Sequence, residues 1–107
     1  WLDQLPGPYT LVFKLKKKNA IAKSVNQGGG TVGVRLPQHW FSGFVKELGV
    51  PIITTSANRS GKRFMTSMED LDIEIKKGIH FAVYEGEKNG KPSKIVNLAN
   101  GGEVKER

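Results

Sequence analysis

The chain has 107 residues, of which 37% are hydrophobic and 25% charged, and this composition favours one globular domain, or part of one, over disorder. The absence of cysteine excludes disulfides and thiolate metal sites, and we expect a reducing, cytoplasmic setting. No apolar run is long enough to cross a bilayer, and the net charge of +7 favours an anionic partner such as a nucleotide or RNA, although lysine-rich surfaces also occur in proteins from hot environments.

The first predicted elements are a turn, a strand and a loop. Pro and Gly over residues 5–8 predict a stiff turn, and the β-branched and aromatic residues of 9–15 predict a strand. Residues 20–30 are ambiguous. The triple glycine at 28–30 lacks the Gly-Lys-Ser/Thr sequence of a phosphate-binding P-loop, so we interpret it as a plain loop.

A strand and a helix are predicted next. Apolar residues alternate over 31–36, which predicts one buried face and a second face that carries Thr31 and Arg35. From 38 to 48 the apolar residues recur at helical spacing, and Gly49 follows as a C-terminal cap. We expect Trp40 to pack into the core at the edge of this helix.

The second half begins with a short apolar run at residues 50–53, which predicts a buried strand. The sequence Thr54-Thr-Ser-Ala-Asn-Arg-Ser-Gly61 follows it, and so many small polar groups after a strand indicate either a capped turn or a site for an oxygen-rich ligand. Ser67 and Asp70 resemble a capping box, which predicts a helix over 68–77 closed by Gly78.

The last part of the chain predicts more strands. Residues 81–84 and 93–98 have strand composition, and Asn89-Gly90 predicts a hairpin turn between them. Gly101-Gly102 predicts a turn before a short extended tail. The mixture of strand pairs and interposed helices predicts an α+β fold, a mixed sheet flanked by helices.

Polar side chains gather at the ends of three predicted strands. Thr31 and Arg35 share a face of one, Ser56 and Asn58 share a face of the extended segment after another, and Ser93 opens a third. If the strands are neighbours, these groups could converge on one pocket. No catalytic base stands out, and His39 and His80 lack metal-ligand spacing. The residues alone therefore indicate binding of a phosphorylated or carboxylated small molecule by positioning and charge stabilisation.

Four motifs follow one another along the chain: Pro6-Gly-Pro-Tyr-Thr10, Thr31-Val-Gly-Val-Arg-Leu-Pro37, Thr55-Ser-Ala-Asn-Arg-Ser-Gly61 and Pro92-Ser-Lys-Ile-Val-Asn97. In this order they resemble the motifs of the YrdC-like family of threonylcarbamoyl-adenylate synthases. The resemblance covers nearly the whole chain, and the ordered set is far more specific than any one motif.

The resemblance implies a YrdC-like twisted sheet and an activity. The family makes threonylcarbamoyl-AMP and pyrophosphate from threonine, bicarbonate and ATP with Mg²⁺, for the t6A37 modification of tRNA. The resemblance implies threonine, bicarbonate and ATP as substrates. It also implies the t6A transfer machinery and tRNA or double-stranded RNA as partners, and no association with a membrane. By motif position, the implied ATP-binding residues are Thr31, Asn58, Thr66 and Arg107, and the implied threonine-binding residues are Arg35, Ser56 and Ser93.

The chain also departs from the family pattern. Lys94 and Asn97 stand where the family usually has threonine and aspartate. Family domains are about twice as long, and their lysine-x-arginine motif for the triphosphate is absent here. We therefore expect residues 1–107 to be the C-terminal portion of a single YrdC-like domain, with doubtful activity alone.

Two other functions stay open at this point. One is a non-catalytic YrdC-like module that binds double-stranded RNA or tRNA, which the basic surface would suit. The other is the carbamoyltransferase domain of hydrogenase maturation, for which the absence of cysteine gives no support.

Overall fold

The computed structural model describes residues 1–107, which form two units. The first, Trp1–Val50 with Lys91–Arg107, is called the sheet unit here, and the second, Pro51–Gly90, the loop unit. Each is described by itself. The sheet unit contains the 3₁₀ helices η1 (Leu2–Gln4), η2 (Lys18–Ala20) and η3 (Leu98–Asn100), the helices α1 (Lys23–Asn26) and α2 (Trp40–Leu48), and the strands β1 (Tyr9–Lys14), β2 (Thr31–Arg35), β3 (Lys94–Asn97) and β4 (Glu103–Lys105); the loop unit contains α3 (Ile73–Gly78).

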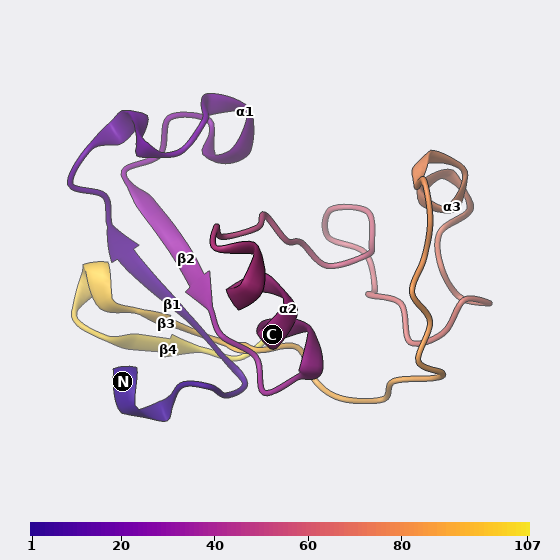
Figure 1. Cartoon of the computed structure of the whole chain (residues 1–107). Helices are drawn as coiled ribbons and strands as arrows, with labels where there is room; N and C mark the ends of the chain where they lie inside the picture. Colours follow the sequence, from indigo (N-terminus) through magenta and orange to yellow (C-terminus); the bar gives the residue numbers. More distant parts are fainter. The chain divides into compact units, whose positions relative to one another are not determined.

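The sheet unit is built on four strands in the order β2-β1-β3-β4 (Figure 1). β1 pairs with β2 antiparallel and with β3 parallel, and β4 pairs with β3 antiparallel. This mixed sheet confirms the predicted α+β class. The strands predicted over 9–15, 31–36 and 93–98 are present with slightly shorter bounds.

One row of apolar side chains across the sheet forms its core. The register places Leu11 opposite both Val34 and Val96, and Val96 opposite Val104. Leu11 and Val96, in the two central strands, are fully buried, whereas Val34 and Val104, in the edge strands, are nearly half exposed. The predicted burial of this face of β2 is therefore wrong for this chain, because the strand lies at the sheet edge, where Val34 stays 44% exposed.

Helix α2 confirms the helix predicted over 38–48 and begins two residues later than expected. His39 caps its first turn, since its Nδ1 accepts a hydrogen bond from the Phe41 amide at 3.2 Å. Gly49 ends it in the left-handed conformation at φ 77°. The apolar face is exposed, and Trp40 itself is 57% exposed, so its predicted place in the core is wrong.

The loop unit has no strand. The strands predicted over 50–53 and 81–84 and the hairpin at Asn89-Gly90 are all wrong. Strand propensity favours an extended backbone, but a strand forms only where a second strand pairs with it. These segments find no such partner in the chain, and Ile53 and Phe81 are 74% and 81% exposed.

Helix α3 starts at Ile73, so the helix predicted from residue 68 is five residues too long at its start. Asp72 is the N-cap, and its carboxylate accepts hydrogen bonds from the Glu74 and Ile75 amides. The predicted capping box is present in part, because the Asp70 carboxylate accepts a hydrogen bond from the Ser67 amide, as well as from the Thr66 amide. The helix that it was expected to start is absent at this position, since α3 begins only at Ile73.

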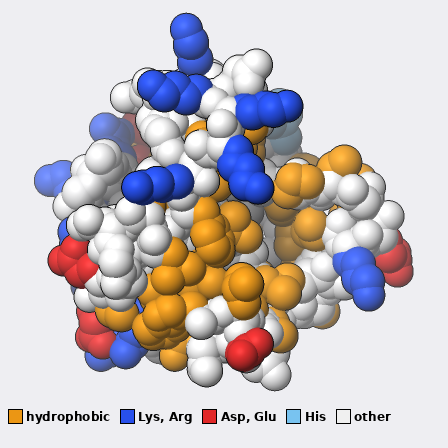
Figure 2. Space-filling view, turned by 90° about the vertical axis from the view of Figure 1, so that its left-hand side faces the viewer, with side chains coloured by type: hydrophobic (Ala, Val, Ile, Leu, Met, Phe, Trp, Pro, Cys, Tyr) orange, Lys and Arg blue, Asp and Glu red, His pale blue; other side chains and the backbone are white.

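Large hydrophobic side chains are widely exposed in both units. The fully or nearly buried apolar residues are Leu11, Val96 and Leu71. On the face shown in Figure 2, hydrophobic side chains cover a broad area, with Lys and Arg side chains beside it. No helix is long and apolar enough to cross a membrane.

Candidate functional site

A groove of about 470 Å³ lies at the end of β2, beside Arg35. Arg35 is exposed and has no ion-pair partner in the chain, so its guanidinium can receive a carboxylate or a phosphate. Seven residues line the groove: Gly7, Pro8, Arg35, Pro37, Gln38, His39 and Phe41.

The turn at residues 5–8 forms one wall of this groove. The Gly7 amide donates to the Leu36 carbonyl at 2.9 Å, which fixes the turn against the end of β2. A Cβ on Gly7 would stand 2.5 Å from the Gln4 carbonyl oxygen, so the turn requires glycine here. The Pro-Gly-Pro motif therefore shapes the groove through its backbone.

Arg35 and Ser93 lie at the same end of the sheet. Arg35 pairs with Thr10 and Thr10 with Ile95, and side chains two residues apart share a face, so Ser93 is on the Arg35 face as well. Ser93 is 4% exposed, and the neighbouring Lys94 amide donates to the Pro8 carbonyl at 3.0 Å. The structure thus places two of the three predicted threonine-binding residues on one face and at one end of the sheet, with β1 between their strands, and Ser93 does not line the groove of Arg35.

Thr31 lies at the opposite end of β2. It pairs with Lys14, whereas Arg35 pairs with Thr10, so the two are separated by about 13 Å along the strand. Their predicted common face is confirmed by the strand alternation. The expected convergence of Thr31 with Ser93 at one strand end is not observed.

Arg107 lies on the other side of Ser93, on the segment that follows β4. It lines a cavity of about 150 Å³ together with Lys91, Pro92, Lys94 and Glu106. Lys94 Nζ and Glu106 Oε1 form an ion pair at 2.8 Å across this cavity. Arg107 is therefore at the same end of the sheet as Ser93.

In the loop unit, Asn58 holds a tight turn. Its amide donates to the Ser56 carbonyl at 3.0 Å, so Ser56 and Asn58 do not share a face of an extended segment, and that prediction is wrong. The Asn58 side-chain nitrogen donates to the carbonyls of Arg59 and Lys62 at 2.9 and 3.0 Å. Its Oδ1 is buried and accepts no hydrogen bond within the chain.

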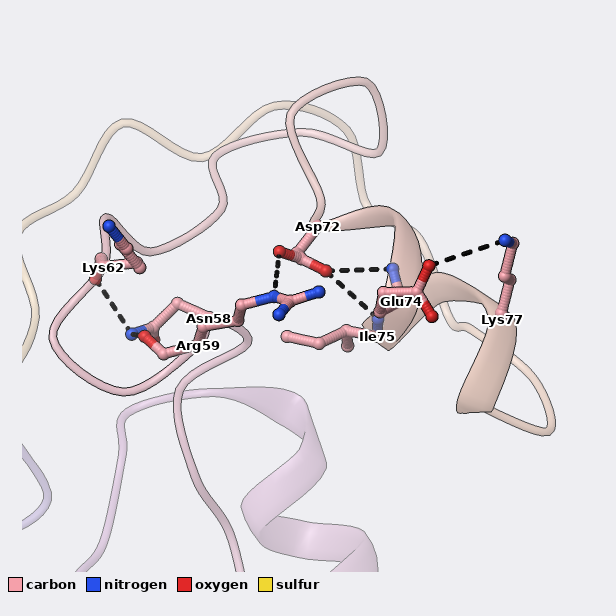
Figure 3. A network of polar contacts seen from close by, with 7 residues as sticks. All are labelled: Asn58, Arg59, Lys62, Asp72, Glu74, Ile75 and Lys77. Carbon is pink, nitrogen blue, oxygen red and sulfur yellow. Dashed lines mark hydrogen bonds and ion pairs between the residues drawn. The ribbon is translucent and has the colours of Figure 1, made fainter.

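Arg59 connects this turn to the start of α3 (Figure 3). Its Nε donates to Asp72 Oδ2 at 2.7 Å, while the other carboxylate oxygen caps the helix. The hydrogen bond from Arg59, the largest cause, and those from the Glu74 and Ile75 amides lower the pKa of Asp72. Arg59, the arginine of the Thr55–Gly61 motif, is thus paired with Asp72 within the loop unit.

The side chain of Thr66 can only accept a hydrogen bond from a ligand. Its hydroxyl donates to Asp70 Oδ2 at 2.6 Å, and its amide donates to the same carboxylate. The Thr66 hydroxyl, followed by the Ser67 and Thr66 amides, lowers the pKa of Asp70 to about 2, so this carboxylate is ionised and cannot donate. Thr66 therefore suits a ribose hydroxyl or an amino group better than a phosphate oxygen.

Several of these features were missed by the sequence analysis. The Lys94–Glu106 and Arg59–Asp72 pairs join residues 12 and 13 positions apart, and only the fold shows that they meet. The close approach at Gly7 had a signal, since a glycine between two prolines indicates a backbone constraint. No group of three or more His, Asp or Glu side chains could hold a metal ion.

Comparison with known proteins identifies the family. The family model Sua5_yciO_yrdC, described as "Telomere recombination", matches residues 2–106. The chain belongs to the Sua5/YciO/YrdC family.

Curated relatives of this family are similar to the chain over part of their length. A putative threonylcarbamoyl-AMP synthase of Methanocaldococcus jannaschii is 38% identical over 96 residues, which are 88% of this chain and 43% of the relative. The threonylcarbamoyl-AMP synthase of Bacillus subtilis is 39% identical over 75 residues (65% and 21%), and that of Bos taurus 35% over 70 residues (64% and 25%). The chain thus spans less than half the length of the relatives it matches.

Proposed function

We propose that this chain is the C-terminal portion of a single YrdC-like domain, residues 1–107, and carries part of the ATP and threonine site of a threonylcarbamoyl-AMP synthase. The names of the relatives support the activity. The observation that carries the site is the Arg35 guanidinium, which has no ion-pair partner in the chain and lines a groove at the end of β2.

The chemistry proposed for this site is positioning of two substrates. Arg35 binds the threonine carboxylate through its planar fork, and the hydroxyls of Ser93 and Ser56 orient the rest of the amino acid. A carbamate oxygen formed from threonine and bicarbonate attacks the α-phosphorus of ATP, and the bond from that phosphorus to the pyrophosphate oxygen breaks. No proton has to be removed from the carbamate at neutral pH, so the absence of a side-chain base at Arg35 is no obstacle.

The nucleotide is assigned to the four remaining residues: Thr31, Asn58, Thr66 and Arg107. Arg107 would meet phosphate charge, while the Asn58 Oδ1 and the Thr66 hydroxyl would accept hydrogen bonds from the nucleoside. Mg²⁺ would arrive with the triphosphate as part of the substrate. The chemistry that Mg²⁺ supplies is neutralisation of phosphate charge.

The exposed apolar surface supports the view that the domain continues beyond this chain. The apolar face of α2 and the segments at 50–53 and 81–84 are exposed, although their composition is that of buried elements. We propose that the remainder of the family domain covers these surfaces and supplies further phosphate contacts. The proposal also includes a cytoplasmic location, a tRNA or duplex RNA partner suited to the net charge of +7, and delivery of the product to the t6A transfer machinery.

The test is pyrophosphate release that depends on both ATP and threonine. It is run on this chain and on a chimera in which the N-terminal part of the Methanocaldococcus jannaschii relative precedes residue 1. We expect activity in the chimera and little in the chain alone. An inactive but folded chimera would overturn the synthase proposal. An RNA affinity that falls with salt concentration and is unchanged by Ser56→Ala and Asn58→Ala would instead favour a non-catalytic module.

Arg35 is tested in the same chimera. Arg35→Ala should raise the Kd of threonine at least tenfold and leave the Kd of ATP within about twofold, because only threonine carries the carboxylate that Arg35 binds. Arg63→Ala is the matched control, because this substitution removes the same charge from the loop unit. Equal weakening of both substrates by Arg35→Ala would refute the assigned role.

A further inference from the structure

The net positive charge of this chain is concentrated in one stretch of the sequence. Residues 4–46 contain no Asp or Glu, while the rest of the chain carries ten basic and ten acidic side chains, so the whole net charge of +7 belongs to this stretch. Its first five basic side chains are all exposed, and together they are called the lysine surface here. They are Lys14, Lys16, Lys17, Lys18 and Lys23.

The fold places the lysine surface at the end of β2 opposite the Arg35 groove. Lys14, in the last position of β1, pairs with Thr31, in the first position of β2. The connection 15–30, which contains α1 and the other four lysines, therefore leaves and rejoins the sheet at this end (Figure 1). Arg35 is about 13 Å away along β2, so the lysine surface is separate from the groove beside Arg35.

Backbone hydrogen bonds hold the connection, and the lysine side chains take no part in them. The Ala20 amide donates to the Lys17 carbonyl at 3.1 Å, and the Gln27 amide donates to the Lys23 carbonyl at 2.6 Å. None of the five lysines forms an ion pair within the chain. Their ammonium groups are therefore available to a ligand, and substitution of these side chains should leave the fold intact.

Unpaired lysines at this density favour an anionic partner. The lysines that stabilise proteins at high temperature form networks with acidic side chains, and residues 4–46 offer none. Consecutive like charges repel one another, and a bound polyanion would offset that repulsion. The lysine surface is therefore better explained by binding than by stability.

The composition of the connection favours the phosphate backbone of a duplex over other anionic partners. Residues 14–31 contain no aromatic side chain on which the bases of a single strand could stack. Val25 is their only exposed large hydrophobic side chain, which is too little apolar surface to anchor a helix in a lipid interface. Protein–protein interfaces are depleted of lysine, whereas lysine is a common partner of nucleic-acid phosphates.

We propose that the lysine surface binds the phosphate backbone of duplex RNA. The inference rests on the proposed function for the choice of RNA rather than DNA. Lysines on an exposed connection neutralise backbone phosphates and release counterions without reading the base sequence. Because the lysine surface and the Arg35 groove lie at opposite ends of β2, RNA and threonine can be bound at the same time.

The test measures how the Kd of a fluorescently labelled RNA duplex depends on salt concentration, by anisotropy with the full 107-residue chain. The triple variant Lys16→Gln, Lys17→Gln and Lys18→Gln should raise the Kd at least about tenfold at low salt. It should also flatten the slope of log K against log salt concentration by about 2–3, roughly one for each lost phosphate contact. Circular dichroism checks that the variant is folded.

The matched control removes the same charge from the loop unit, by Lys62→Gln, Arg63→Gln and Lys76→Gln. It should change the slope by less than about one, because the proposal gives these side chains no phosphate contact. Equal effects of the two triple variants would overturn the inference, since net charge alone would then drive binding. A single strand of the same sequence that binds as tightly as the duplex would overturn it as well.

A second arm separates the lysine surface from the nucleotide site. In the chimera used for pyrophosphate release, the triple substitution at residues 16–18 should leave the Kd of ATP within about twofold. A loss of ATP affinity with unchanged RNA affinity would assign these lysines to the triphosphate and overturn the inference. Absence of any RNA binding by the unsubstituted chain would also overturn it, while pyrophosphate release would still decide the synthase proposal.

Discussion

Different interactions stabilise the sheet unit and the loop unit, each within itself. In the sheet unit, backbone pairing and the buried side chains of Leu11 and Val96 fix the positions of the strands. In the loop unit, the carboxylates of Asp70 and Asp72 and the amide of Asn58 hold the backbone, and the helix α3 is only six residues long. Arg35 and Ser93 therefore take their places from strand register, whereas Asn58 and Thr66 take theirs from local polar contacts.

This contrast predicts that the stability of the two units responds to different kinds of change. The sheet unit should respond to changes in apolar volume, because its core is a single row with two fully buried side chains. The loop unit should respond to charge and pH, because charge-assisted hydrogen bonds supply most of its defined contacts. The following predictions test that division.

The largest effect is expected from Leu11→Ala. Leu11 is fully buried and contacts its row on both sides, so its removal should lower the free energy of unfolding by about 2–5 kcal/mol. Denaturant unfolding followed by circular dichroism measures the loss. Ile53→Ala, a similar truncation at a 74% exposed side chain in the loop unit, serves as the control and should cost far less. Similar losses in the two variants would contradict the division.

The sequence predicted the elements of the sheet unit better than those of the loop unit. β1, β2 and α2 were predicted because alternation and helical spacing within each segment agree with the tertiary contacts that they make. The segments at 50–53 and 81–84 have the same strand composition, but a strand also requires a partner, and a single-sequence pattern does not reveal whether one exists. The chain supplies none, so local propensity gives the wrong answer there.

The candidate site was predicted in the same uneven way. The sequence predicted that Arg35 and Ser93 converge on one pocket if their strands are neighbours. The register places both residues at one end of the sheet, but β1 lies between their strands and Ser93 does not line the groove of Arg35. The hydrogen-bond direction of Thr66 could not be foreseen, because it depends on Asp70, whose spacing imitates a capping box. Lys94 was noted as a departure, but its partner Glu106 becomes evident only from the register of β3 and β4.

A smaller effect is expected from Gly49→Ala, which separates the helix from the sheet within one unit. Gly49 has φ 77°, and a side chain in this conformation costs about 1 kcal/mol. Amide hydrogen exchange should speed up in the last turn of α2 while the β1 amides keep their protection. Gly43→Ala is the control, because Gly43 lies inside the helix with nothing near its Cβ position, and it should slow exchange instead. Faster exchange throughout β1 in Gly49→Ala would show that helix and sheet unfold together.

The most local effect is expected on acidification, and it should be confined to the loop unit. Asp70 has a pKa of about 2 in the folded chain against an ordinary value of 3.8, so its stabilising effect is complete above pH 3.8 and is lost as the pH falls through 2. The amide resonances of Thr66 and Ser67 should shift with a midpoint near pH 2, because protonation removes an ionised acceptor from both. NMR spectra recorded from about pH 6 down to about pH 1 measure this midpoint.

Two variants decide whether Asp70 is the cause. Asp70→Asn should abolish the titration of both amides, since the amide side chain carries no charge at any pH in this range. Glu69→Gln removes the adjacent carboxylate and should leave the midpoint unchanged. A midpoint near 3.8 in the unsubstituted chain would mean that the Thr66 hydroxyl does not donate to Asp70 in solution. Thr66 would then be able to donate to a phosphate, and its assignment to the nucleoside would have to be reversed.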